Sequence, residues 1–149
     1  MKLFRIVLSA AAVILLAASC NKVEMNMLSP ESEYKAPVLN APASINLTAA
    51  VLAKDEDITF SWTKADFGQP AEITYNINAS YGGKTTVMFA ILRGSDSYTV
   101  KASELGAKLT DLGVPHSKTV SVTFNMDCTI GSNFTTLKSA DKAISVYVE

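Results

Sequence analysis

Histidine and cysteine are scarce in this sequence of 149 residues, which holds one histidine, His116, and two cysteines, Cys20 and Cys128. A structural zinc site is tetrahedral and draws its ligands from these residue types, so too few are present to close one. His116 follows Pro115 in a predicted turn, and no nucleophile elbow or glycine-rich phosphate loop accompanies it. The sequence therefore predicts a surface histidine, no catalytic residue, no metal site and no cofactor.

A charge excess of either sign is also absent, since 13 Lys and Arg residues stand against 14 Asp and Glu residues. Without residues 1–19, which include Lys2 and Arg5, the balance becomes eleven against 14, a net charge near −3. Nucleic-acid binding relies on a basic surface, so charge excludes nucleic acid as a partner. The one acidic cluster, 55–57, lacks the spacing of a calcium loop and is expected to be solvated turn charge.

Long apolar runs are absent except at the N-terminus, where residues 6–19 follow Lys2 and Arg5 and lead through small residues to Cys20. This order is typical of a secretory signal, and the run is shorter than the roughly 20 residues of a membrane-spanning helix. Leu-Ala-Ala-Ser-Cys at 16–20 resembles the bacterial lipoprotein signal, which implies that Cys20 is lipidated and anchors the chain in a membrane. The alternative is ordinary cleavage near Ala18, with Cys20 unmodified.

Lipidation of Cys20 would leave Cys128 without a partner, so no disulfide is expected in the exported domain. Cys128 is in register with the apolar side of an alternating run that contains Phe124 and Met126. We expect it to be a small buried hydrophobic residue rather than a reactive thiol.

Composition divides the remaining chain into a tether and one domain. Residues 20–36 are polar, are interrupted by Pro30 and lack a sustained period, which predicts a flexible tether after the signal peptide at 1–19. Pro37 and Pro42 mark the entry to a single domain at 37–149.

Apolar and polar residues alternate through most of this domain, as in half-buried β-strands. About seven short strands separated by turn signals predict an all-β fold, an antiparallel immunoglobulin-like or fibronectin-III-like sandwich. The apolar members of the main runs are Ile58, Phe60, Trp62, Ile73, Tyr75, Ile77, Ala79, Tyr81, Val87, Phe89, Ile91, Val122, Phe124, Met126, Ile144, Val146 and Val148.

One helix interrupts the strands, at about 103–112. Ser103 is placed to cap it, Leu105, Leu109 and Leu112 share one face, and Gly113 is placed to end it.

Aromatic side chains are the candidate sugar-binding residues, because sugar rings present C–H faces that pack on aromatic planes. Trp62 and Tyr75 lie on apolar sides of their strands and are assigned to the core. Phe67, Phe134 and Tyr147 lie off the inward register or in loops, and we expect them to be exposed and available for glycan binding.

Several segments together resemble the N-terminal domain of SusE-type outer-membrane lipoproteins, which belong to the glycan-utilisation systems of Bacteroidetes. They are APVLNAP, ITFSWTKADFG, ITYNINAS, ASELGAKLTDLGV and VSVTFNMD, within roughly 36–149. The resemblance implies an immunoglobulin-like fold and a lipid-anchored location at the outer membrane, with the cell surface favoured and the periplasmic side as the alternative.

The resemblance also implies a function, that of an accessory protein with a polysaccharide and an outer-membrane transporter complex as partners. Sugar binding in this family is associated with domains that follow this one, so no glycan-contact residue carries over. The alternative is a non-catalytic spacer or protein-interaction module without sugar binding, docking a neighbour by a sheet edge or by loops.

Overall fold

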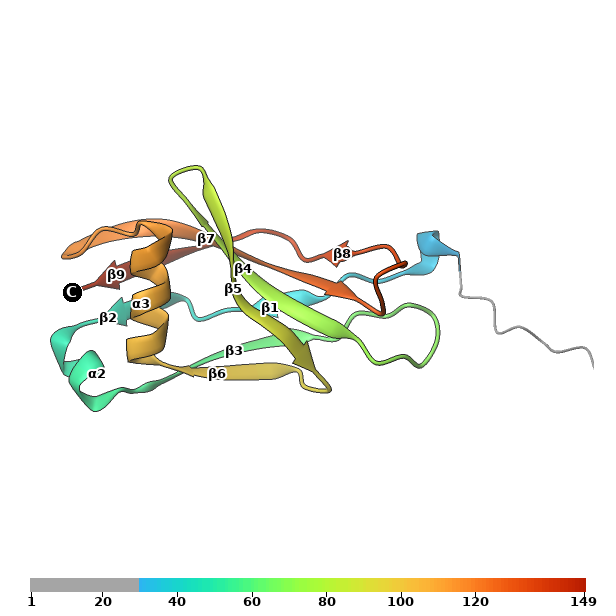
Figure 1. Ribbon diagram of the computed structural model, residues 1–149, viewed down its shortest axis with the longest axis horizontal. Helices are drawn as coiled ribbons and strands as arrows, with labels where there is room; N and C mark the ends of the chain where they lie inside the picture. Colours follow the sequence, from blue (N-terminus) through green and yellow to red (C-terminus); the bar gives the residue numbers. More distant parts are fainter. Residues whose placement is uncertain (1–29) are drawn as a thin grey trace, which may run out of the picture.

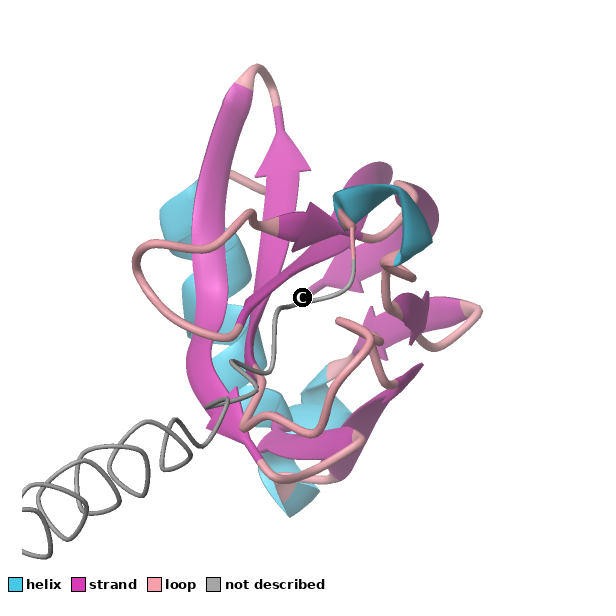
Figure 2. Ribbon diagram, turned by 90° about the vertical axis from the view of Figure 1, so that its right-hand side faces the viewer, coloured by secondary structure: helices cyan, strands magenta, loops and turns pink. Residues whose placement is uncertain are grey.

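The computed structural model describes residues 30–149, which form two β-sheets with a helix across one end (Figures 1 and 2). One sheet has the strand order β1-β3-β6, and the other has the order β2-β9-β7-β4-β5, with β8 paired to β7. The strands are β1 (Val38–Asn40), β2 (Ser44–Leu47), β3 (Asp57–Thr63), β4 (Thr74–Tyr81), β5 (Lys84–Arg93), β6 (Ser97–Lys101), β7 (Lys118–Thr129), β8 (Leu137–Lys138) and β9 (Lys142–Val148). The helices are η1 (Glu31–Glu33), α2 (Ala49–Lys54) and α3 (Ala102–Leu112).

The core lies between the two sheets and confirms the predicted all-β sandwich. Side chains of β7 and β9 alternate between buried and more exposed positions, because successive residues of a strand point to opposite faces, and β4 follows the same pattern except at the buried Asn78. Trp62 is 4% exposed and Tyr75 is 1% exposed, so both belong to the core as expected. The grouping of β1-β3-β6 against β9-β7-β4 matches the immunoglobulin arrangement of strands A, B and E against C, F and G.

Strand β5 departs from the predicted alternation. The register places Ile77 opposite Phe89 and Asn78 opposite Val87, so Met88 is an extra residue on the β5 side. A bulge of this kind rotates the strand and changes which side chains face inward. Met88 is therefore buried and Val87 is 53% exposed, which corrects the expected inward position of Val87.

The pairing of β2 with β9 is parallel, in contrast to the predicted purely antiparallel sandwich. After β1 the chain crosses from the small sheet to the large one, so that β2 lies beside the last strand. The backbone N–H of Glu149 continues this contact by donating to the carbonyl of Leu47 at 3.0 Å. A pairing between positions so distant in the chain leaves no local sequence signal.

Helix α3 confirms the predicted helix, although its start differs. Leu105, Leu109 and Leu112 are buried against the sheets, and Gly113 ends the helix with a φ of 100°. Ser103 does not cap it: the helix begins at Ala102, directly after β6, and the backbone N–H of Ser103 donates to Asp55 Oδ1 at 2.9 Å. The short helix α2, capped by Thr48, was not predicted from the sequence.

The predicted signal peptide, Cys20 and the first part of the predicted tether lie outside the described residues. The rest of that tether contacts the sandwich before the predicted boundary at residue 37. The rings of Tyr34 and Phe67 are 5.1 Å apart, and the backbones of Lys35 and Asp66 form an isolated bridge. Within residues 30–149, no helix is both long and apolar enough to cross a membrane.

Candidate functional site

The outward face of the large sheet is almost entirely polar where β4 and β7 run side by side. The strands are antiparallel, so partners such as Asn78 and Asn125 or Ser80 and Thr123 meet on the same face. We call this surface the polar face, and it consists of Thr74, Asn76, Asn78, Ser80, Thr123, Asn125, Asp127 and Thr129.

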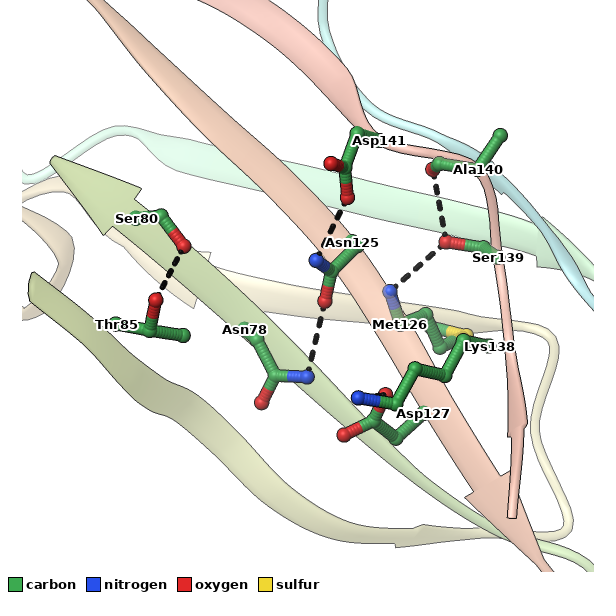
Figure 3. Close-up of polar contacts among 10 residues, drawn as sticks. All are labelled: Asn78, Ser80, Thr85, Asn125, Met126, Asp127, Lys138, Ser139, Ala140 and Asp141. Carbon is green, nitrogen blue, oxygen red and sulfur yellow. Dashed lines mark hydrogen bonds and ion pairs between the residues drawn. The ribbon is translucent and has the colours of Figure 1, made fainter. Parts of the chain in front are cut away.

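A chain of hydrogen bonds crosses the polar face (Figure 3). Asn78 Nδ2 donates to Asn125 Oδ1 at 3.1 Å, and Asn125 Nδ2 donates to Asp141 Oδ1 at 2.9 Å. On the neighbouring strand pair, the hydroxyls of Ser80 and Thr85 lie 2.8 Å apart. Asn125 is thus held from both sides, and its carboxamide is fixed in orientation before any ligand arrives.

A carboxylate and an amine lie next to this chain of hydrogen bonds. Lys138 Nζ is 3.9 Å from Asp127 Oδ1, a buried oxygen that has no hydrogen-bond partner among the described residues. Behind them, the hydroxyl of Ser139 accepts from the backbone N–H of Met126 at 2.9 Å and donates to the carbonyl of Ala140 at 3.1 Å. Ser139 thereby fastens the segment that carries Lys138 and Asp141 to β7.

The structure separates the three predicted sugar-binding aromatic residues. Phe67 is 1% exposed, so the expectation that it is available to a sugar is wrong: Tyr34 packs on its ring. Phe134 is 41% exposed in the loop that follows β7. Tyr147 is half-buried and pairs with Thr119, at the opposite end of β7, about 30 Å away for a strand of this length.

His116 and Cys128 are two further residues that the sequence analysis considered as functional candidates. His116 is exposed, with Nδ1 2.9 Å from the backbone oxygen of Glu149. Cys128 is buried as expected, and burial, with a smaller effect of the nearby Asp127, raises the pKa of its thiol to about 12. A thiol with such a pKa stays protonated at neutral pH and is a poor nucleophile.

The acidic cluster at 55–57 is divided between separate partners. Asp55 accepts from the backbone N–H of Ser103, and this hydrogen bond lowers the pKa of its carboxyl group. Glu56 Oε1 is 3.9 Å from Lys54 Nζ, and Asp57 Oδ1 is 2.8 Å from Lys101 Nζ. Among residues 30–149, no group of three or more His, Cys, Asp or Glu side chains is placed to hold a metal ion.

The sequence could have located the polar face only in part. Alternation in TYNINAS and TFNMD assigns Asn78 and Asn125 to the outward sides of their strands. The contact between Asn78 and Asn125 depends on the register between β4 and β7. The hydrogen bond from Asn125 to Asp141 depends on the path of the loop before β9. Neither is encoded in a local pattern.

The polar face is partly covered, since Asn78 is 6% exposed and its other seven residues are half-buried. Its ordered carboxamide, carboxylate and hydroxyl groups together can both donate and accept hydrogen bonds. The family model described as SusE outer membrane protein matches residues 21–127. The chain therefore belongs to the SusE family and is an outer-membrane protein. The comparison with curated proteins gives no match, and neither does the comparison with solved structures.

Proposed function

We propose that this protein is a lipid-anchored, non-catalytic accessory protein of an outer-membrane polysaccharide-utilisation system, and that it binds glycan weakly through the polar face. The observation that carries the glycan assignment is the hydrogen-bonded chain from Asn78 through Asn125 to Asp141. Membership of the SusE family supports the wider role.

The chemistry of the polar face suits sugar hydroxyls. Each hydroxyl both donates and accepts, and carboxamides, carboxylates and hydroxyls offer the complementary atoms. Asn125 and Asp141 already hold each other in place. Their rotamers are fixed before a sugar binds, so less side-chain entropy is lost on binding. None of the residues of the polar face is aromatic, which is why we expect dissociation constants near the millimolar range, about −4 kcal/mol of binding free energy.

Affinity electrophoresis of the full chain through gels containing soluble polysaccharides tests the glycan assignment. We expect retention by at least one glycan of a broad panel, and at least a fivefold loss of affinity in Asn125→Ala. Thr59→Ala is the matched control. This substitution removes a side-chain hydroxyl that contacts Thr99 at an exposed position of the small sheet.

Two further variants test the sequence-based candidates. Retention that is lost in Phe134→Ala or Tyr147→Ala but kept in Asn125→Ala would move the sugar site from the polar face to that aromatic ring. An absence of retention over the whole panel would contradict glycan binding and favour the spacer or protein-interaction role.

The lipid anchor is tested separately by fractionation. Cys20→Ala removes the thiol that the lipoprotein signal requires, and we expect the protein to leave the membrane fraction. Cys128→Ala is the control and should stay with the membrane, since Cys128 is buried in the core. Unchanged fractionation of Cys20→Ala would refute the anchor without bearing on the polar face.

A further inference from the structure

Strand β5 has one unpaired edge. It is the last strand of the large sheet, and among the described residues it pairs with β4 alone. Figure 1 shows the β4–β5 hairpin projecting beyond the body of the sandwich, so this part of the edge is open to an incoming chain. An exposed edge presents a row of backbone donors and acceptors, the chemistry that recognises another extended peptide.

The turn of the hairpin identifies which backbone groups face outward. Gly82 and Gly83 both have positive φ, 57° and 79°, as in the two-residue turn that joins tightly paired strands. The residues that flank such a turn, Tyr81 and Lys84, form a hydrogen-bonded pair, and pairs then alternate along the ladder. Thr85 and Val87 fall in the non-hydrogen-bonded pairs, so their N–H and C=O groups point away from β4.

A groove follows this edge between β5 and the second half of α3. It has a volume of about 450 Å³ and is lined by residues 84–88 of β5 and by Lys108, Asp111 and Leu112 of α3. Lys108 is held in place with its Nζ 5.5 Å from the centre of the Phe89 ring. The exposed Val87 lies at the edge itself, where a side chain of an added strand would pack against it.

The charge of the groove favours an acidic partner segment over a second copy of this chain. Lys84 and Lys108 outnumber Asp111, so the groove carries a net positive charge. Pairing of two β5 edges from two copies of the chain would bring four lysines together against two aspartates, which disfavours self-association. We propose that the free edge of β5 is a docking site for an extended acidic segment of a partner protein, which adds to the large sheet as a further strand.

A fluorescent ten-residue peptide of alternating Glu, Val and Thr serves as the probe, with the full chain in detergent. We expect saturable binding that weakens as salt rises, together with slower hydrogen exchange at the amides of Thr85 and Val87. A peptide with Lys in place of Glu should bind at least tenfold more weakly. Equal binding of both peptides, or no protection of these two amides, would overturn the proposal.

Two variants separate edge pairing from general charge attraction. Val87→Pro deletes an outward N–H without removing a hydrogen bond to β4, and we expect at least tenfold weaker binding. Lys84→Glu keeps the backbone intact and should weaken binding about fivefold, whereas Lys64→Glu, in the loop after β3, should leave it unchanged. If Val87→Pro fails to fold, as judged by circular dichroism, Lys84→Glu against Lys64→Glu still decides the question.

Two other outcomes assign the edge to a different occupant. Sedimentation that shows a dimer of the full chain, lost in Lys84→Glu, would overturn the proposal in favour of a second copy. Glycan retention that is lost in Lys84→Glu would likewise overturn it, in favour of sugar. Retention that depends on Asn125 alone concerns the polar face, so the two proposals fail independently.

Discussion

Cys128 shows how the burial of one residue links the core to the pH dependence of stability. Burial raises the pKa of its thiol from 9.0 to about 12. Between these values the unfolded chain loses the thiol proton while the folded chain keeps it, so ionisation favours the unfolded state. The free energy of unfolding is therefore fully retained below about pH 9 and falls above it, by at most about 1.4 kcal/mol per pH unit from this group.

We expect Cys128→Ala to flatten this decline. Urea unfolding from pH 8 to pH 11 should give a shallower loss of stability in the variant than in the parent protein, although the variant is less stable at pH 7 by about 1 kcal/mol. Tyr75, whose pKa is raised mainly by burial and in smaller part by Cys128, is present in both proteins, so the effect of burial on it cancels in the comparison. Parallel pH profiles would contradict the raised thiol pKa.

The sequence predicts single residues well where they lie within a regular strand. Trp62, Tyr75 and Cys128 were assigned to the core from alternation alone, and all three are buried. Phe67 was assigned wrongly because it lies in a loop, where period-two alternation does not apply. Its cover is Tyr34, a contact that joins two irregular segments and has no periodic signal.

Two glycines of the α3 region differ in how well their positions would accommodate a side chain. Gly106 lies inside the helix, and a Cβ at this position would be 3.4 Å from Leu47 Cδ1 and 3.6 Å from Leu52 Cδ2, both ordinary contacts. Gly113 ends the helix with a φ of 100°, a conformation that is strained for any residue with a Cβ.

Substitution of these glycines should change stability in opposite directions. We expect Gly106→Ala to raise the free energy of unfolding by about 0.5–1 kcal/mol, through lower backbone entropy in the unfolded chain. Gly113→Ala should lower it by about 1 kcal/mol or more. Chemical denaturation measures both, and a loss of stability in Gly106→Ala would show that Leu47 and Leu52 cannot accommodate the methyl group.

Elements were predictable in proportion to their regularity. The leucine spacing of α3 and the alternation in β4 and β7 gave elements that the structure confirms. The bulge at Met88 escaped prediction because residues 87–92 are all apolar, so alternation does not assign their faces, and only the pairing with β4 reveals the shift in register. Likewise, the start of α3 depends on Asp55, which comes from a distant loop.

The whole molecule is elongated, and the described chain runs from one end of it to the other. Figure 1 shows η1 at one end of the long axis and the end of β9 at the other. The polar face and the free edge of β5 both belong to the large sheet, but they lie on its face and at its margin respectively. Two ligands could therefore occupy the sheet at the same time.

The parallel pairing of β2 and β9 determines how the domain resists a pulling force. Once β1 is peeled away, tension applied to the two ends of the described chain draws β2 and β9 in opposite directions along their length. Their four paired positions, together with the hydrogen bond from Glu149 to Leu47, are then loaded simultaneously in shear. A force applied to both strands at the same end would instead break these bonds one after another, as in a zipper.

Single-molecule pulling can compare the two geometries in Cys20→Ala proteins that differ only in one attachment point. Handles at Ser32→Cys and Glu149→Cys load the pair in shear, whereas handles at Ala50→Cys and Glu149→Cys unzip it. We expect a severalfold higher unfolding force in shear, because forced unfolding follows the barrier to rupture rather than the equilibrium stability. That resistance would matter for the proposed role, in which a lipid anchor holds one side of the sandwich and a glycan pulls on the other.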